Sequence, residues 1–327
     1  MERLVIIGSV PPPFGGVSIH LERYIELNKD SYHIKLIQYT KLSDISRFLA
    51  LLWIIFYPLK LKFYINHINK LVFLALLIRP FKKETEFYDH NYRYIESLNA
   101  FERLIFYRFI QKQKVIYIVN ENIIQYYADY GLDIKKKAVL RKPFLPPILK
   151  DEEKIRKSYP VIISQIIHTK SPILTANAFR FEQYRNIDLY GIDLCIEITR
   201  KLKNTYPRIG FIFFVSLAEG DYYNELMNRV KKYKLEKNFF FITGNYQFWP
   251  ILKNADIFIR PTYTDGDAIS VHEALFFNKT VIASNLENRP NNIILFENRN
   301  SNDLELKVIT ALRKLNINPD ESTLLNR

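Results

Sequence analysis

The chain of 327 residues has few of the features that mark disulfide-rich, zinc-binding or membrane-spanning proteins. Its one cysteine, Cys195, excludes an intrachain disulfide framework and fits a reducing compartment. No group of cysteine and histidine residues has the spacing of a zinc site. The two longest apolar stretches, 44–59 and 71–78, are shorter than the roughly 20 residues that cross a bilayer. The first apolar run is too short for a signal peptide, so we expect a cytoplasmic protein.

Glycine is also scarce, with nine residues, and no G-x-G-x-x-G pattern occurs, so the sequence gives little support to a dinucleotide fingerprint. No internal repeat or low-complexity segment is present. What the chain does contain is a hydrophobic fraction of 48% and a charged fraction of 25%, which are typical of a globular protein. Its length is sufficient for two domains.

The formal net charge of +13 favours an anionic partner, which could be a nucleotide phosphate, a nucleic acid or an acidic membrane surface. The lysines and arginines are spread along the chain and no nucleic-acid-binding motif is present. We therefore expect no nucleic acid among the partners.

The most informative stretch, residues 254–290, reads as a strand, a polar loop, a helix and a second strand. The first strand, 257–259, ends before Arg260 and Pro261, because proline cannot donate to a sheet ladder. Asp265 or Asp267 is the expected N-cap of the following helix. This order is one turn of a parallel α/β sheet, in which ligands bind beyond the carboxyl ends of the strands.

Two acidic residues of this stretch, Asp265 and Glu273, are eight positions apart and can both face such a crevice. Carboxylates accept hydrogen bonds from hydroxyl groups, as a ribose or a hexose would offer, and a helix N-terminus suits a phosphate. The alternative is that Asp265 and Asp267 are caps and Glu273 is a surface charge. For an isolated pair of acids this alternative is favoured, because short motifs often occur by chance.

The amino-terminal stretch has the same order of elements: a strand at 4–7, a loop at 8–16 and a helix from Val17. Gly15 and Gly16 would let the backbone approach a phosphate or sugar closely, or they form a simple tight turn. The residues alone leave both readings open. We expect the helix residues His20, Glu22 and Arg23 to form a mostly solvated face, with the alternative that Arg23 turns inward.

These stretches together resemble the retaining family-four glycosyltransferases. Residues 265–275, DGDAISVHEAL, are similar to the E-x7-E donor motif of that family, and PPPFGGVSIHLERY at 11–24 is similar to its glycine loop. The resemblance implies the GT-B fold, with two Rossmann-like domains facing each other across a cleft. We predict an acceptor domain at 1–168 and a nucleotide-sugar donor domain at 169–327. The first acid is Asp265 instead of glutamate, which shortens its reach by one methylene.

The resemblance also implies a retaining transfer of a sugar from a nucleotide-diphosphate sugar, with no metal and no further cofactor. It assigns Glu273 to the ribose hydroxyls, Asp265 and His90 to the donor sugar, and Arg180 to the diphosphate. The implied catalytic residues are His90, Asp265 and Glu273, and the implied donor-binding residues are Gly15, Gly16, Asn91, Arg180, Tyr246, Asp267, Ala268, Ile269 and Arg289.

One departure from the family concerns the lysine that precedes a glycine and binds the donor diphosphate, because this chain has Tyr190 before Gly191. Arg185 or helix amides could take over its role. The alternative function is a catalytically impaired glycosyltransferase-like protein that binds nucleotides or glycans.

The expected acceptor is a glycan, or a glycan on a polyprenyl carrier, in bacterial surface polysaccharide biosynthesis. This expectation rests on the net charge and on the apolar, aromatic-rich segment that includes Phe48, Trp53, Phe56 and Tyr57, with Arg47, Lys60 and Lys62 beside them. The segment forms either buried helix or a monotopic surface on the inner face of an anionic membrane.

Overall fold

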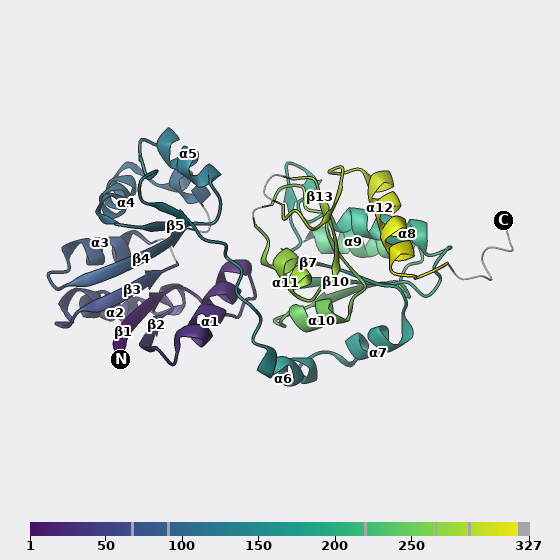
Figure 1. Ribbon diagram of the computed structural model, residues 1–327, viewed down its shortest axis with the longest axis horizontal. Coiled ribbons are helices and arrows are strands. Elements are labelled where there is room, and N and C mark those ends of the chain that lie inside the picture. Colours follow the sequence, from purple (N-terminus) through teal and green to yellow (C-terminus); the bar gives the residue numbers. More distant parts are fainter. Residues whose placement is uncertain (67–68, 90–91, 219–220, 266, 287–288, 320–327) are drawn as a thin grey trace. The chain divides into compact units, whose positions relative to one another are not determined.

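The structure is a computed structural model that describes residues 1–66, 69–89, 92–218, 221–265, 267–286 and 289–319 (Figure 1). The chain divides into two compact units. The first comprises Met1–Pro12 and Gly16–Leu145, and the second comprises Pro13–Gly15 and Pro146–Arg327. Each unit contains its own parallel sheet, so the predicted α/β fold with two Rossmann-like domains is confirmed.

The sheet of the first unit has the strand order β2-β1-β3-β4-β5-β6, and all of its pairings are parallel. Its strands are β1 (Glu2–Ile7), β2 (Tyr32–Ile37), β3 (Leu61–Ile65), β4 (Lys83–Asp89), β5 (Ile116–Ile118) and β6 (Ala138–Leu140). The helices of this unit are α1 (Gly16–Asn28), α2 (Asp44–Phe56), α3 (Lys70–Ile78), α4 (Ala100–Lys112) and α5 (Asn122–Asp129), with the short 3₁₀ segments η1 (Tyr39–Lys41) and η2 (Tyr92–Ser97).

Successive residues of β1 point into two different apolar clusters, as the two-residue repeat of a strand requires. Val5 and Ile7 join a cluster that includes residues of α2, α3 and α4. Leu4 and Ile6 join a second cluster that includes Leu21 of α1. The strand is therefore buried on both faces, which explains its continuous apolar sequence.

The sheet of the second unit has the order β11-β10-β7-β12-β13-β14 and is also parallel. Its strands are β7 (Ile173–Arg180), β10 (Gly210–Leu217), β11 (Phe239–Thr243), β12 (Ile257–Arg260), β13 (Thr280–Ser284) and β14 (Ile294–Phe296), and β8 (Gln183–Tyr184) and β9 (Ile187–Asp188) form a small antiparallel pair. The helices are α6 (Glu152–Lys157), α7 (Val161–Thr169), α8 (Ile192–Leu202), α9 (Asp221–Lys232), α10 (Trp249–Asn254), α11 (Ile269–Phe276) and α12 (Ser301–Lys314), preceded by the 3₁₀ segment η3 (Leu149–Asp151).

Each sheet has a point at which the order of its strands reverses. In the first unit this switch point lies between β1 and β3, and in the second it lies between β7 and β12. Open α/β sheets bind their ligands outside the carboxyl ends of the strands at such a point. The carboxyl ends of β7 and β12 are therefore the first place to look for a site in the second unit.

The observed division at Leu145 and Pro146 differs from the boundary that we predicted between 168 and 169. Residues 146–168 contact the second unit instead of the first. Ile163 and Ile166 of α7 belong to the apolar cluster that contains Phe258 of β12. Lys253 of α10 forms an ion pair of 2.7 Å with Glu152 of α6. The apolar side of α7 therefore completes the second core.

The strands and helices that we predicted around 4–28 and 254–290 form where we expected them. Helix α8 begins at Ile192, directly after Gly191, which adopts a left-handed conformation with φ of 66°. His20 and Arg23 are buried in α1, so our expectation of a solvated position was wrong for His20, whereas Arg23 takes the inward alternative. They reach inward because His20 contacts the Pro143 carbonyl and Arg23 the Leu145 carbonyl.

Candidate functional site

The loop that connects β12 to α11 carries the first acid of the D-x7-E motif, and this acid lies between two arginines. Asp265 Oδ2 accepts hydrogen bonds from Arg260 Nε at 2.8 Å and from Arg289 Nη1 at 3.0 Å. Asp265 Oδ1 accepts a third from Arg260 Nη2 at 3.1 Å. All three side chains are mostly buried, with exposed fractions of 11% for Asp265, 10% for Arg260 and 4% for Arg289. We call these three residues the arginine–aspartate cluster.

The cluster lies at the switch point of the second sheet. Arg260 is the last residue of β12, and its Nη1 donates to the backbone carbonyl of Asn177 in β7 at 3.0 Å. Its guanidinium also lies 5.8 Å from the ring centre of Tyr190. Arg289 donates to the carbonyl of Ser284, the last residue of β13, at 3.3 Å. Three neighbouring strands are thus joined at their carboxyl ends by one set of charged side chains.

The charges of the cluster depend on one another. Burial raises the pKa of Asp265, but the charges and hydrogen bonds of Arg260 and Arg289 outweigh it, so the carboxyl pKa lies below its ordinary value of 3.8. Burial lowers the pKa of Arg289 despite the attraction of Asp265. The pKa of Arg260 is raised, because the attraction of Asp265 exceeds the effect of burial. Asp265 is therefore ionised and both arginines are charged at neutral pH.

The helix after this loop, α11, has Ala268 at its N-cap and no side-chain cap. Our prediction that Asp265 or Asp267 caps it was therefore wrong. Asp265 is held by the arginines, and Asp267 contacts Nε2 of His272 one turn into the helix. The first amide groups of α11 thus remain uncapped by any side chain of the described chain, and the helix dipole at this end favours a negative charge.

The second acid of the motif, Glu273, lies on α11 with an exposed fraction of only 3%. It lies near Tyr159, whose pKa is raised first by burial and further by the negative charge of Glu273. The Tyr159 hydroxyl donates to the Gln247 carbonyl at 2.6 Å, and its ring packs edge-on against Tyr246, with 5.9 Å between ring centres. Glu273, which the resemblance assigned to the ribose, and Tyr246, which it placed among the donor-binding residues, thus both lie near Tyr159.

The part of the chain that carries the D-x7-E motif matches a known protein family. Residues 184–314 match the family model described as glycosyl transferases group 1, and this match spans the D-x7-E motif and the arginine–aspartate cluster. The chain is a glycosyltransferase. The predicted resemblance to family-four glycosyltransferases is thereby confirmed. No curated protein matches the sequence.

Solved structures similar to this glycosyltransferase have the GT-B fold. HepE of Anabaena, in complex with UDP and glucose, is 11% identical with a TM-score of 0.66, covering 97% of this chain and 92% of HepE. Sucrose-phosphate synthase of Thermosynechococcus elongatus is 12% identical with a TM-score of 0.63, covering 96% and 90%. A glycosyltransferase of Rickettsia africae is 14% identical with a TM-score of 0.62, covering 96% and 89%. At these identities the likeness establishes the fold.

Two positions considered for the donor diphosphate form no hydrogen bond or ion pair with the cluster in the described structure and contact other side chains instead. Arg180, the last residue of β7, is exposed and forms a double hydrogen bond with Glu182, at 2.9 Å for each contact. Arg185, the possible substitute for the missing lysine, lies in the turn between β8 and β9, where its guanidinium lies 5.2 Å from the ring centre of Tyr184. At the lysine position itself, the Tyr190 ring packs near Arg260.

The four remaining predicted residues are only partly described. Gly16 is the first residue of α1, and Gly15 precedes it. His90 and Asn91, which the family resemblance assigned to the donor, lie outside the described residues. Their assignments remain predictions.

One polar residue that we did not single out lies at the switch point of the first sheet. Asn66 follows β3, and its amide N–H donates to the carbonyl of Ile7, the last residue of β1, at 3.0 Å. Its side chain is buried, and neither Nδ2 nor Oδ1 has a hydrogen-bond partner in the described structure. An asparagine directly after a buried strand was the signal that could have identified it.

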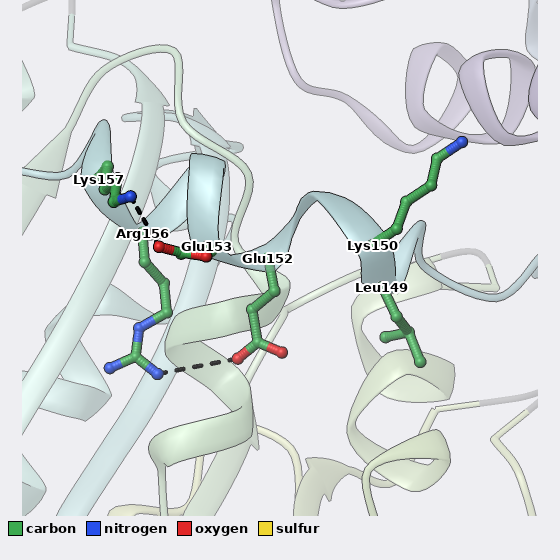
Figure 2. A pocket seen from close by; sticks show the side chains of 6 residues that line it. All are labelled: Leu149, Lys150, Glu152, Glu153, Arg156 and Lys157. Atoms are coloured by element: carbon green, nitrogen blue, oxygen red, sulfur yellow. Dashed lines mark ion pairs between the residues drawn. The ribbon is translucent and has the colours of Figure 1, made fainter.

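A surface hollow of about 530 Å³ lies elsewhere in the second unit (Figure 2). It is lined by residues of η3 and α6, and none of the predicted site residues belongs to it. Figure 2 shows that ion pairs within α6, Arg156 with Glu152 and Lys157 with Glu153, occupy much of its wall. Within the described ranges, no group of three potential ligands could hold a metal ion. The expectation that transfer needs no metal stays a prediction.

Proposed function

We propose that this glycosyltransferase transfers a sugar from a nucleotide-diphosphate sugar, with retention of configuration, to a glycan or lipid-linked acceptor of surface polysaccharide biosynthesis. The observation that carries the proposal is the position of Glu273 and the uncapped start of α11 at the β7–β12 switch point, inside the matched family domain. The HepE structures that contain UDP and UDP-glucose support a uridine nucleotide as the first ligand to test.

Each proposed role follows from the chemistry of the residue. Glu273 accepts hydrogen bonds from the ribose hydroxyls, and Tyr246 lies beside the base. The backbone amides of Asp267, Ala268 and Ile269 surround the sugar and its phosphate, as the positive end of a helix dipole favours. Arg180 leaves Glu182 and turns to the diphosphate. Catalysis then rests on fixed dipoles and cations that stabilise the leaving diphosphate.

Thermal-shift measurements with UDP, GDP, ADP and their sugar conjugates test the donor site first. A selective rise in Tm with one nucleotide supports the proposal and identifies the base. The preferred sugar nucleotide is then incubated with lipid-linked acceptors, and the anomeric configuration of the product is read by NMR. An inverted product contradicts the retaining mechanism, and the absence of a Tm shift with every nucleotide contradicts the donor site.

A second candidate function is nucleotide or glycan binding without turnover. It is favoured by Tyr190, whose ring lies near Arg260 at the position where the family has a phosphate-binding lysine. The two functions separate when binding and transfer are measured on the same preparation. Nucleotide binding without sugar transfer or donor hydrolysis supports the second candidate, and restored transfer by Tyr190→Lys would identify the missing cation as its cause.

The first unit has an exposed apolar face, which is relevant to the proposal of a lipid-linked acceptor. Helices α2, α3 and α4 lie side by side, with α3 in the middle (Figure 1). Each places large apolar side chains in solvent, and together they are Ile45, Phe48, Leu49 and Phe56 of α2, Leu71 and Ile78 of α3, and Phe101 and Leu104 of α4. No helix of the described chain is long and apolar enough to cross a membrane.

In the structure, the membrane hypothesis rests on other residues than those that the sequence suggested. Trp53 and Tyr57, which the surface alternative would expose, are partly buried against the core of the first unit. The three basic residues that we named form ion pairs, namely Arg47 with Asp44, Lys60 with Glu84, and Lys62 with Glu86. The hypothesis therefore needs other cations.

A basic group does adjoin the apolar face at the ends of α3 and α4. Burial lowers the pKa of Lys83, and the nearby positive charges of Lys112 and Arg79 lower it further. We propose that the face on α2, α3 and α4 rests peripherally on an anionic membrane, where the exposed Lys112 at the end of α4 meets lipid headgroups.

Flotation with vesicles of anionic and of neutral lipid tests this surface at low salt. We expect binding to anionic vesicles, and a loss of about tenfold or more when Phe48 and Phe101 are both replaced by serine. Replacement of Val139, an exposed apolar residue of β6, by serine is the control. Absence of flotation at low salt contradicts the proposal.

A further inference from the structure

The carboxylate of Asp265 accepts four hydrogen bonds from neighbouring side chains. Besides the three hydrogen bonds from Arg260 and Arg289, its Oδ2 accepts a fourth from Thr262 Oγ1 at 3.1 Å. A carboxylate offers about four lone-pair positions. Three of the four bonds converge on Oδ2, so a sugar hydroxyl could bind that oxygen only by displacing a donor, and Oδ1 is already bound by the buried, charged Arg260.

The same groups fix the loop from Pro261 to Ala268 at several points. Thr262 Oγ1 also accepts a hydrogen bond from Arg289 Nη2 at 3.0 Å, and the Thr262 carbonyl accepts one from Ser284 Oγ at 2.8 Å. The next residue, Tyr263, donates its backbone amide to the Leu189 carbonyl at 2.9 Å and accepts from Asn298 Nδ2 at 3.0 Å. The first half of the loop is thus tied to the ends of β13 and β9.

We propose that Asp265 is a positioning residue: with Arg260 and Arg289 it fixes the β12–α11 loop so that the first amides of α11 face the donor phosphate, and it does not contact the sugar. This inference rests on the proposed function, because it concerns the same donor site. It replaces the sugar contact that the family resemblance assigned to this acid. The shorter aspartate side chain fits a group that bonds back to its own loop.

Binding measurements can distinguish a positioning residue from a residue that holds the sugar. A positioning residue acts on the phosphate-binding amides, so its loss weakens UDP and UDP-glucose by the same factor. A residue that holds the sugar weakens UDP-glucose alone. The ratio of the two dissociation constants therefore separates the two roles, whatever the absolute affinities are.

The experiment compares Asp265→Asn with the wild-type protein by calorimetry, using UDP and UDP-glucose or the corresponding pair for the base selected in the thermal-shift screen. We expect both affinities to fall by about tenfold, with an unchanged ratio. A loss confined to the sugar nucleotide would overturn the inference. Thr262→Val, which removes the hydroxyl that donates to Asp265 and accepts from Arg289, should show a smaller and equally shared loss and serves if Asp265→Asn does not fold.

The matched control is Glu197→Gln in α8. Glu197 is also bound by two nitrogens of one arginine, Arg200, at 2.9 and 2.6 Å, but this pair lies on an exposed helix surface outside the cluster. Removing its charge tests whether any loss of an arginine–carboxylate pair in this unit reduces nucleotide affinity. Affinity equal to the wild type is the expected result, and a tenfold loss there would overturn the specific role of Asp265.

A second experiment tests the positioning role without a ligand. Hydrogen exchange of the amides of residues 267–271 should be faster in Asp265→Asn and Thr262→Val than in the wild type and in Glu197→Gln. If no nucleotide binds the wild type, the proposed function fails, but faster exchange still supports the positioning role. Unchanged exchange at these amides would overturn it.

Discussion

Gly191 packs directly against Pro261: a Cβ atom on residue 191 would lie only 2.2 Å from the Pro261 carbonyl oxygen. Gly191 also has a φ of 66°, in the left-handed region that disfavours side chains. It precedes α8, whereas Pro261 follows β12. The contact therefore brings the segment with the missing lysine, at Tyr190, against the loop of the D-x7-E motif.

Gly191→Ala should destabilise the second unit by roughly 3 kcal/mol or more, because strain at φ and a clash with backbone add together. Gly131→Ala is the matched control, since Gly131 has a φ of 79° but nothing within 4 Å of the added Cβ. The control should cost only about 1 kcal/mol. Urea unfolding of both variants measures the difference, and equal costs would show that the Pro261 contact is not tight.

Glu273→Gln should weaken nucleotide binding by about 10- to 100-fold, because a hydrogen bond to a charged group contributes roughly 1.5–3 kcal/mol. Calorimetry with the preferred nucleotide, measured beside its 2′-deoxyribose analogue, checks the assignment. The variant should discriminate less between the two than the wild type does. Unchanged affinity would show that Glu273 does not bind the ribose.

His20 should make the stability of the first unit depend on pH. Its Nδ1–H donates to the Pro143 carbonyl at 2.6 Å, and its Nε2 accepts from the Tyr64 hydroxyl at 2.8 Å, so the ring is held neutral. Burial lowers the pKa of His20 from 6.5 to about 4. The folded protein thus binds this proton less tightly than the unfolded chain, and stability is lost as the pH falls from 6.5 towards 4.

The loss attributable to His20 should approach about 3 kcal/mol at the acid end of this range. His20→Gln, which keeps a donor and an acceptor but does not titrate, should lack it. The free energy of unfolding of both proteins at pH 7 and at pH 4.5 provides the comparison. If the two proteins lose stability in parallel, His20 does not control the acid response.

Asn66→Ala should raise the KM for the acceptor by roughly two- to tenfold and leave the affinity for the nucleotide unchanged, because one or two neutral hydrogen bonds are removed. The reason is the buried Asn66 amide, which lacks a side-chain partner in the described structure and lies at the β1–β3 switch point. Steady-state kinetics with the acceptor varied checks it. An equal loss for donor and acceptor would indicate a general disturbance of the fold.

Local patterns were sufficient to predict the elements around the site. The apolar run 257–259 became β12, and the helix and strand after it formed as α11 and β13. The domain boundary depends on tertiary packing, which local patterns do not describe. The apolar spacing of Ile163 and Ile166 predicts a buried helix face, but it does not say which core the face joins, so the domain boundary fell earlier than predicted.

The sequence by itself determined the class of the protein, because the order of strand, loop and helix and the spacing of Asp265 and Glu273 are local properties of the chain. Only the tertiary structure decided that Asp265 lies between Arg260 and Arg289, since Arg289 is 24 positions away and reaches Asp265 only when β12 and β13 pair. Hydrogen-bond partners depend on distance in space. Spacing along the chain therefore located the acid but could not show that its oxygens are already engaged.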